Sequence, residues 1–170
     1  MTQMSTEVLG DERGTLLAFV ESQRAAIRGT LAGLDEEQAA SRPSASELSL
    51  SGLLKHVAEC ELSWLRMAQR KPNERQRTEE DYANAFRLAE GESVASVLEF
   101  WDGIRQETEA FVAAVPSLDA TFPLPPAPWF PKDAKVSVRW MLLHLVEEFA
   151  RHAGHADIVR ESIDGTKAMG

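Results

Sequence analysis

Residues 136–163 read VSVRWMLLHLVEEFARHAGHADIVRESI and contain three of the four histidines in this 170-residue chain. Apolar residues recur at every third or fourth position along the stretch, which is the period of an amphipathic helix. One apolar face collects Met141, Leu145, Phe149, Ala156, Val159 and Ile163. The stretch is therefore predicted to be a long helix whose apolar face covers a hydrophobic core.

Two polar side chains, Glu148 and His152, fall within that apolar face, one turn apart. Burying a carboxylate in a core costs free energy unless the group is paired or bound to a cation. Side chains at positions i and i+4 of a helix lie over the same patch. The pair is therefore predicted to supply two ligands to one metal ion.

A second helix, predicted at about residues 47–70, carries the remaining histidine, His56, on its apolar face. That face consists of Leu53, His56, Val57, Cys60, Trp64 and Met67, whereas Lys55, Glu59 and Arg66 point elsewhere. A lone histidine in such a face is more often a core residue than a ligand. In a helix bundle, however, apolar faces meet, and His56 would then face Glu148 and His152.

The predicted metal ligands are therefore His56, Glu148 and His152. Three nitrogen and oxygen donors leave coordination positions open, as catalytic sites do. Imidazole and carboxylate ligands suit zinc first, with nickel, iron and manganese as alternatives.

Other polar side chains near these faces are weaker candidates. His144 and His155 lie on the flank of the last helix and are expected to orient ligands or to reach the pocket rim. Cys60 follows His56 by one turn; it either lines the site or is a small buried thiol without function. Asp157 and Arg160 are expected to form local ion pairs.

Two further helices are predicted at about residues 11–34 and 93–115. The first buries Leu16, Phe19, Val20, Gln23, Ile27, Thr30, Leu31 and Leu34; the second buries Val94, Leu98, Trp101, Ile104, Thr108, Phe111 and Val115. Asp11 and Ser93 suit the N-cap position, because their side chains can accept hydrogen bonds from free N–H groups. Three tryptophans, Trp64, Trp101 and Trp140, are expected to be core residues.

Two long connections join these helices. Residues 71–92 are polar and are expected to form a crossover loop, with at most a short helix at 82–89. Residues 116–135 contain six prolines, which exclude a helix or a central strand. A short linker is expected at 35–46, and no strand is predicted anywhere. The chain is therefore predicted to be all-α, a single domain over residues 1–170 that forms an antiparallel four-helix bundle.

Charge and composition exclude several function classes. The net charge of −9 opposes binding to nucleic acid or to an anionic membrane surface. No apolar stretch reaches the length of about 20 residues that a membrane helix needs, and no secretion signal is visible. A single cysteine excludes an intramolecular disulfide. We expect a soluble cytoplasmic protein.

Two segments carry a resemblance to a known family. The stretch RWMLLHLVEEFARHAGHADIVRE (139–161) resembles the fourth-helix signature of the DinB-like superfamily, and SGLLKHVAE (51–59) resembles its second helix. The similarity extends from the first helix to about Gly165. It is strongest to small proteins related to mycothiol-dependent maleylpyruvate isomerase. The resemblance implies a bundle, often a homodimer, with a divalent metal held by His56, Glu148 and His152.

The resemblance also implies a thiol-dependent activity. The metal would bind a low-molecular-weight thiol, of the mycothiol or bacillithiol type, and lower its pKa for attack on a small electrophile. The isomerase has a C-terminal domain that contributes to its active site, whereas this chain ends soon after the last predicted helix. Maleylpyruvate isomerisation itself is therefore not expected.

Two alternatives remain open at this point. The first is a metal-dependent hydrolase in which metal-bound water is the nucleophile. Glu147 or Asp157 could serve as its base, although the helical phase turns both away from the apolar face. The second is a non-catalytic bundle that binds a metal or a small molecule. The sequence does not identify the substrate, the thiol or the metal.

Overall fold

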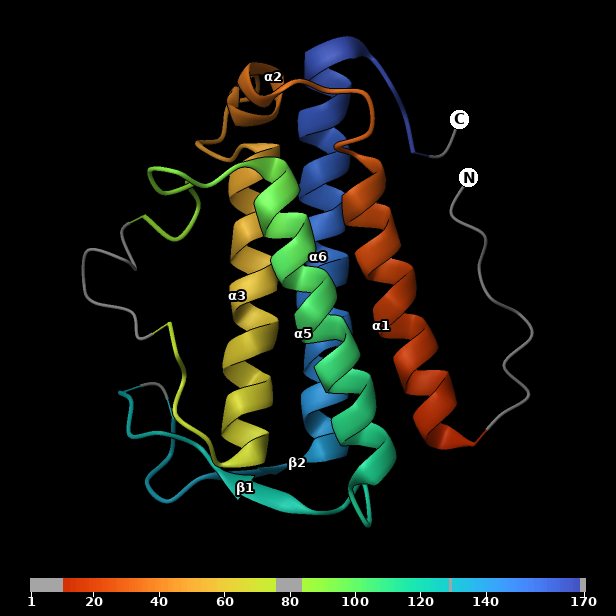
Figure 1. Ribbon diagram of the computed structural model, residues 1–170, viewed down its shortest axis with the longest axis vertical. Helices are drawn as coiled ribbons and strands as arrows, with labels where there is room; N and C mark the ends of the chain where they lie inside the picture. The colour runs from red at the N-terminus through yellow and green to blue at the C-terminus, as the bar shows by residue number, and fades with distance from the viewer. Residues whose placement is uncertain (1–10, 76–83, 129, 169–170) are drawn as a thin grey trace.

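The computed structural model describes residues 11–75, 84–128 and 130–168, and in these residues four long helices form a bundle (Figure 1). They are α1 (Glu12–Gly29), α3 (Leu50–Gln69), α5 (Val94–Ala114) and α6 (Val138–Asp164). Helices α1 and α6 run in one direction, and α3 and α5 run in the other (Figure 1). The predicted all-α bundle is thus confirmed, with its parallel helices as neighbours: α1 packs mainly on α6, and α3 on α5.

Each long helix begins at a residue whose side chain accepts a hydrogen bond from a backbone N–H in the first turn, which stabilises a helix start. These N-cap residues are Asp11, Ser49, Ser93 and Ser137. The first helix ends earlier than predicted, because residues 30–33 form a turn and Gly33 has a positive φ of 76°. The glycine therefore lies in the turn after the helix and not in its last residues.

Three short elements were not predicted. Helix α2 (Glu36–Ala40) lies within the expected linker, and strands β1 (Thr121–Pro123) and β2 (Lys135–Ser137) pair antiparallel. The prolines exclude a central strand but allow a two-stranded ribbon, in which Pro123 occupies the strand end. Residues 84–89 contain a turn and no helix, and residues 82–83 lie outside the described part.

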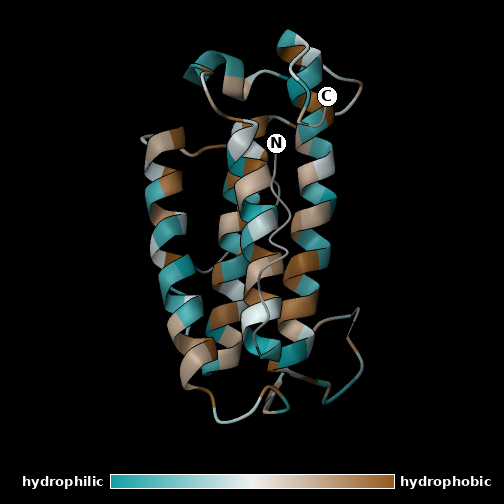
Figure 2. Ribbon diagram, turned by 90° about the vertical axis from the view of Figure 1, so that its right-hand side faces the viewer, coloured by the Kyte–Doolittle hydropathy of each residue, from teal (hydrophilic) through white to brown (hydrophobic). Residues whose placement is uncertain are grey.

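The core lies between the inner faces of the helices and consists of apolar side chains. Hydrophobic and hydrophilic residues alternate along each helix (Figure 2), as expected of a helix with one buried face. Trp101 and Phe149 are fully buried, but two predicted core residues are not: Phe19 is 56% exposed and Trp140 is 41% exposed. Phe19 follows the apolar period only loosely, because it lies about 100° around the helix from the buried Val20. Within the described ranges, no helix combines the length and the apolar character needed to cross a membrane.

Helix α3 is buried on more sides than its sequence predicts. Lys55, Glu59 and Arg66, which were expected to face away from the core, are all at most 9% exposed. Each is compensated by an ion pair: Lys55 with Glu92 at 2.8 Å, Glu59 with Arg75 at 3.1 Å, and Arg66 with Glu107 at 2.7 Å. Two of these partners, Arg75 and Glu92, belong to the connection between α3 and α5, which therefore covers this side of α3.

A second buried polar cluster links three helices. The Glu61 carboxylate on α3 is fully buried and pairs with the equally buried Arg24 of α1, whose Nε lies 3.0 Å from Oε2. On α5, Trp101 Nε1 and Thr108 Oγ1 each donate a hydrogen bond of 2.8 Å to the same carboxylate. Burial opposes the charge on Arg24, but Glu61 outweighs it and raises the pKa of the guanidinium.

Candidate metal centre

Helices α3 and α6 bring the three predicted ligands together. His56 projects from α3, and its Nε2 lies 3.2 Å from Oε1 of Glu148 on α6. The Nε2 of His152, one turn further along α6, lies 3.1 Å from the same oxygen. One ligand atom from each residue falls within 4.8 Å of the others, although His56 and Glu148 are 92 positions apart in the sequence.

The three side chains are mostly withdrawn from solvent. Their side-chain exposures are 16% for His56, 14% for Glu148 and 9% for His152. Hydrogen bonds from His152 and then from His56 hold the pKa of Glu148 well below its ordinary value, although burial acts in the opposite direction. The site therefore presents a carboxylate anion between two imidazoles.

The donor set fits a divalent metal ion. Zinc binds imidazole nitrogen and carboxylate oxygen at about 2.0–2.2 Å, so ligands at tetrahedral angles lie about 3.4 Å from one another. The nitrogen-to-oxygen separations of 3.2 and 3.1 Å in the structure are close to that spacing. Three protein donors would leave at least one coordination position for an external ligand.

Two neighbours on α6 support the trio. Nδ1 of His155 lies 3.3 Å from Nδ1 of His152, so one of the two nitrogens donates a hydrogen bond to the other. If His152 uses Nε2 as a ligand, its Nδ1 carries the proton and donates to His155, which fixes the imidazole orientation. Arg151, which sequence reasoning missed, donates from Nη1 to the second oxygen of Glu148 at 3.1 Å. The i, i+3 spacing of Glu148 and Arg151 could have predicted this contact, because residues three apart on a helix are neighbours.

The other candidates on α6 have different surroundings. His144 packs between two indoles, stacked on Trp140 with ring centroids 5.0 Å apart and edge-on to Trp64 at 4.7 Å. Arg160 forms the expected local ion pair, with Asp164 at 2.8 Å. The Oδ1 atom of Asp157 is buried and has no hydrogen-bond partner in the described part of the chain.

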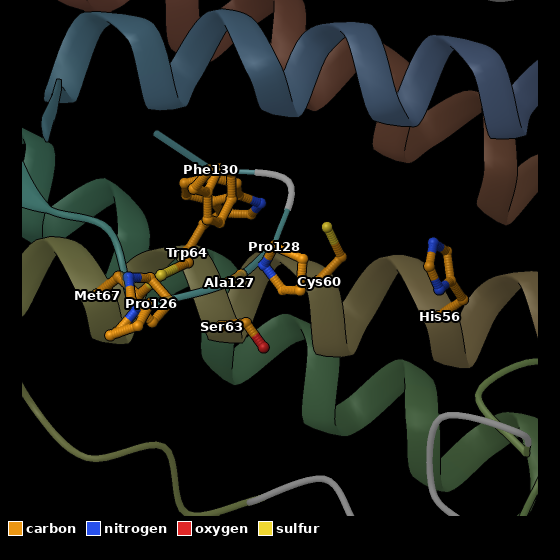
Figure 3. A pocket seen from close by; sticks show the side chains of 10 residues that line it. His56, Cys60, Ser63, Trp64, Met67, Pro126, Ala127, Pro128 and Phe130 are labelled. Atoms are coloured by element: carbon orange, nitrogen blue, oxygen red, sulfur yellow. The ribbon is translucent and has the colours of Figure 1, made fainter. Parts of the chain in front are cut away.

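A cavity of about 460 Å³ adjoins His56 (Figure 3). Residues of helix α3 and of the proline-rich segment between β1 and β2 line it together (Figure 3). Its lining consists of His56, Cys60, Ser63, Trp64, Met67, Pro125, Pro126, Ala127, Pro128 and Phe130. Cys60 thus lies on the wall of this cavity, one turn from His56.

Comparison with known proteins places the fold. A solved structure, "Crystal structure of the conserved protein of locus from Enterococcus faecalis", superposes with a TM-score of 0.69 over 92% of this chain and 99% of that one. The two share 14% sequence identity, so the likeness concerns the fold alone. No curated protein matches the chain.

The sequence model described as Mycothiol-S-transferase matches residues 15–165, which include all four long helices except the first three residues of α1. In agreement with the DinB-like resemblance of its second and last long helices, the chain belongs to the mycothiol S-transferase family.

Proposed function

We propose that the protein is a metal-dependent S-transferase that joins a low-molecular-weight thiol of the mycothiol type to a small electrophile. The observation that carries this proposal is the convergence of His56, Glu148 and His152 on one point at the inner surface of the bundle. The family match supports the thiol as a substrate. The adjoining cavity provides space for a second reactant beside His56.

In this proposal the three side chains hold a divalent ion, with zinc the first candidate and nickel, iron and manganese the alternatives. The bound ion would lower the pKa of the thiol and so supply a thiolate at neutral pH. Nε2 of His56, Nε2 of His152 and Oε1 of Glu148 would supply the donor atoms. The anionic Glu148 would offset one positive charge of the ion, while Arg151 and His155 fix the orientations of Glu148 and His152.

The chemical step is a nucleophilic displacement. The thiol loses its proton to solvent, its sulfur forms a bond to the electrophilic carbon, and the leaving group departs with the electron pair of the broken bond. Burial of the trio keeps bulk water away from the nucleophile, which limits competing hydrolysis. The protein's own contribution is therefore to position the reactants and to shield the nucleophile from water.

Metal titration tests the first half of the proposal. Calorimetry of the metal-free protein with zinc or nickel should show one tight site, and His152→Ala should weaken it by at least 100-fold. His144→Ala is the matched control, because that histidine lies on the same helix but packs between Trp64 and Trp140. Equal affinities for His152→Ala and the unaltered protein would overturn the ligand assignment.

A conjugation assay tests the second half. The metal-loaded protein should couple iodoacetamide to mycothiol faster than the uncatalysed reaction, with bacillithiol and glutathione as parallel thiols. Turnover of ester or amide substrates without any thiol would favour a hydrolase instead. Tight metal binding with neither activity would identify a non-catalytic bundle. The homodimer expected from the family resemblance stays a prediction.

A further inference from the structure

The cavity beside His56 is large enough to hold a small molecule. Its volume of about 460 Å³ lies within the range of about 300–1,000 Å³ that is typical of ligand pockets. It begins at His56 and follows α3 past Cys60 and Trp64 to Met67, a length of about 16 Å at 1.5 Å per residue. One end of the cavity is therefore at the candidate metal centre, and the other end is remote from it.

The lining is chemically uneven along this length. Away from His56 the walls are formed by Trp64, Met67 and Phe130 and by three prolines (Figure 3). Among the described lining residues, Ser63 carries the one hydroxyl group, which already accepts a hydrogen bond of 3.0 Å from Asn73. Among the described residues that line the cavity, none is a carboxylate, a lysine or an arginine.

Such an apolar wall favours one of the two proposed reactants, the thiol and the electrophile, over the other. A thiol that carries sugar hydroxyls needs hydrogen-bond partners, which this wall supplies poorly, and burying unpaired hydroxyls costs free energy. An aliphatic or aromatic group gains free energy on entering the same space, about 0.8 kcal/mol per methylene. The cavity is therefore matched to the electrophile and not to the polar part of the thiol.

We propose that this cavity binds the apolar tail of the electrophile, and that the protein prefers electrophiles with an aliphatic or aromatic tail. This inference rests on the proposed S-transferase function. The tail lies along α3 toward Met67, which leaves the electrophilic carbon at the His56 end. For an N-alkyl iodoacetamide, the thiolate sulfur forms a bond to the CH₂ carbon, the carbon–iodine bond breaks and iodide departs with its electron pair.

A homologous series measures the preference. The metal-loaded protein is assayed with mycothiol and iodoacetamide or its N-ethyl, N-butyl and N-hexyl derivatives. Each added methylene should raise kcat/KM by two- to fourfold over the uncatalysed trend. Met67→Gln should lower the ratio of kcat/KM for the hexyl derivative to kcat/KM for iodoacetamide about tenfold. Leu143→Gln is the control, since Leu143 is 52% exposed on α6 and does not line the cavity.

A binding measurement separates this inference from the proposed function. Metal-free protein is titrated with unreactive N-hexylacetamide, which should bind, and Met67→Gln but not Leu143→Gln should weaken binding about tenfold. The cavity proposal is overturned if kcat/KM does not depend on the length of the alkyl chain, or if both variants bind N-hexylacetamide as well as the unaltered protein does. The S-transferase proposal stands in either case. Selective N-hexylacetamide binding without any conjugation supports the cavity as an apolar site and overturns the S-transferase proposal.

Discussion

Phe86 stacks on His56, with ring centroids 4.2 Å apart and ring planes inclined by 21°. Phe86 lies in the turn before α5, and its backbone carbonyl packs directly against Gly52 of α3. A Cβ atom on Gly52 would lie 2.0 Å from the Phe86 oxygen, so only glycine allows this approach. The position of one predicted ligand thus depends on a backbone contact one turn earlier on the same helix.

Gly52→Ala should therefore affect both stability and metal binding. The added methyl group must displace the turn that carries Phe86, and overpacking of this kind costs about 1–3 kcal/mol. Urea unfolding should show the loss, and calorimetry should show weaker metal binding because His56 loses its stacking partner. Gly103→Ala on α5 is the control: its Cβ would meet nothing within 4 Å, and the change should stabilise the helix by about 0.5–1 kcal/mol. A neutral Gly52→Ala would show that the turn moves freely.

His155→Ala should weaken metal binding without abolishing it. The variant removes the partner of His152 Nδ1, so the imidazole is less well oriented, and losses of this kind are about 10–100-fold. Calorimetric titration with zinc measures the change, with His144→Ala as the reference. A loss as complete as that of His152→Ala would instead make His155 a ligand.

Glu61→Gln should destabilise the fold strongly. The change leaves the fully buried Arg24 guanidinium without its counter-charge, which costs about 3–5 kcal/mol. The midpoint of urea unfolding should fall accordingly. Glu109→Gln is the matched control, because the Arg105–Glu109 pair at 3.0 Å is partly exposed and should contribute less than about 1 kcal/mol. Similar midpoints for the two variants would contradict the importance assigned to the buried pair.

Asp157→Asn should stabilise the protein at neutral pH. Burial, and then the nearby Glu161, raise the pKa of Asp157 in the folded state. Between pH 3.8, the pKa of the unfolded chain, and the higher pKa of the folded state, the folded protein binds more protons than the unfolded chain. The free energy of unfolding therefore falls as the pH rises through this range. Asn carries no charge, so the variant should gain about 1 kcal/mol at pH 7 and nothing at pH 3.

Asp102→Asn should change the stability in the opposite direction to Asp157→Asn at pH 7. A hydrogen bond from Arg28 lowers the pKa of Asp102, so its contribution to stability is present above pH 3.8 and is lost as the pH falls below it. This variant should be less stable than the unaltered protein at pH 7, and the difference should shrink in acid. Thermal unfolding of both variants between pH 3 and pH 7 tests the pair together.

Helical periodicity predicted much of the candidate site. It placed Glu148 and His152 on the inner face of α6 and His56 on that of α3, because residues spaced three or four apart share one face. The bundle then brings these faces together. Periodicity could not place Phe86, because a residue in an irregular connection has no period, and its position depends on the contact with Gly52.

Charged residues were the main source of error in the fold. A charged side chain is ordinarily assigned to the surface, so the burial of Arg24 and Glu61 was not predicted from their positions alone. Their partners come from three different helices, and such a cluster becomes visible only when the helices are packed. Lys55 and Glu59 were misplaced for a related reason, since the connection between α3 and α5 covers them.

The arrangement of the helices also limits the order in which their contacts can form during synthesis. Because α3 and α5 are parallel, the connection between Gln69 and Val94 must carry the chain from one end of the bundle to the other (Figure 1). The first helix packs mainly on the last one, so α1 lacks its main partner until α6 has left the ribosome. Contacts so remote in sequence slow folding, because the loops must close before any contact stabilises them. Glu148 lies 92 positions after His56, so the nascent chain can assemble the predicted metal site only after α6 has been made.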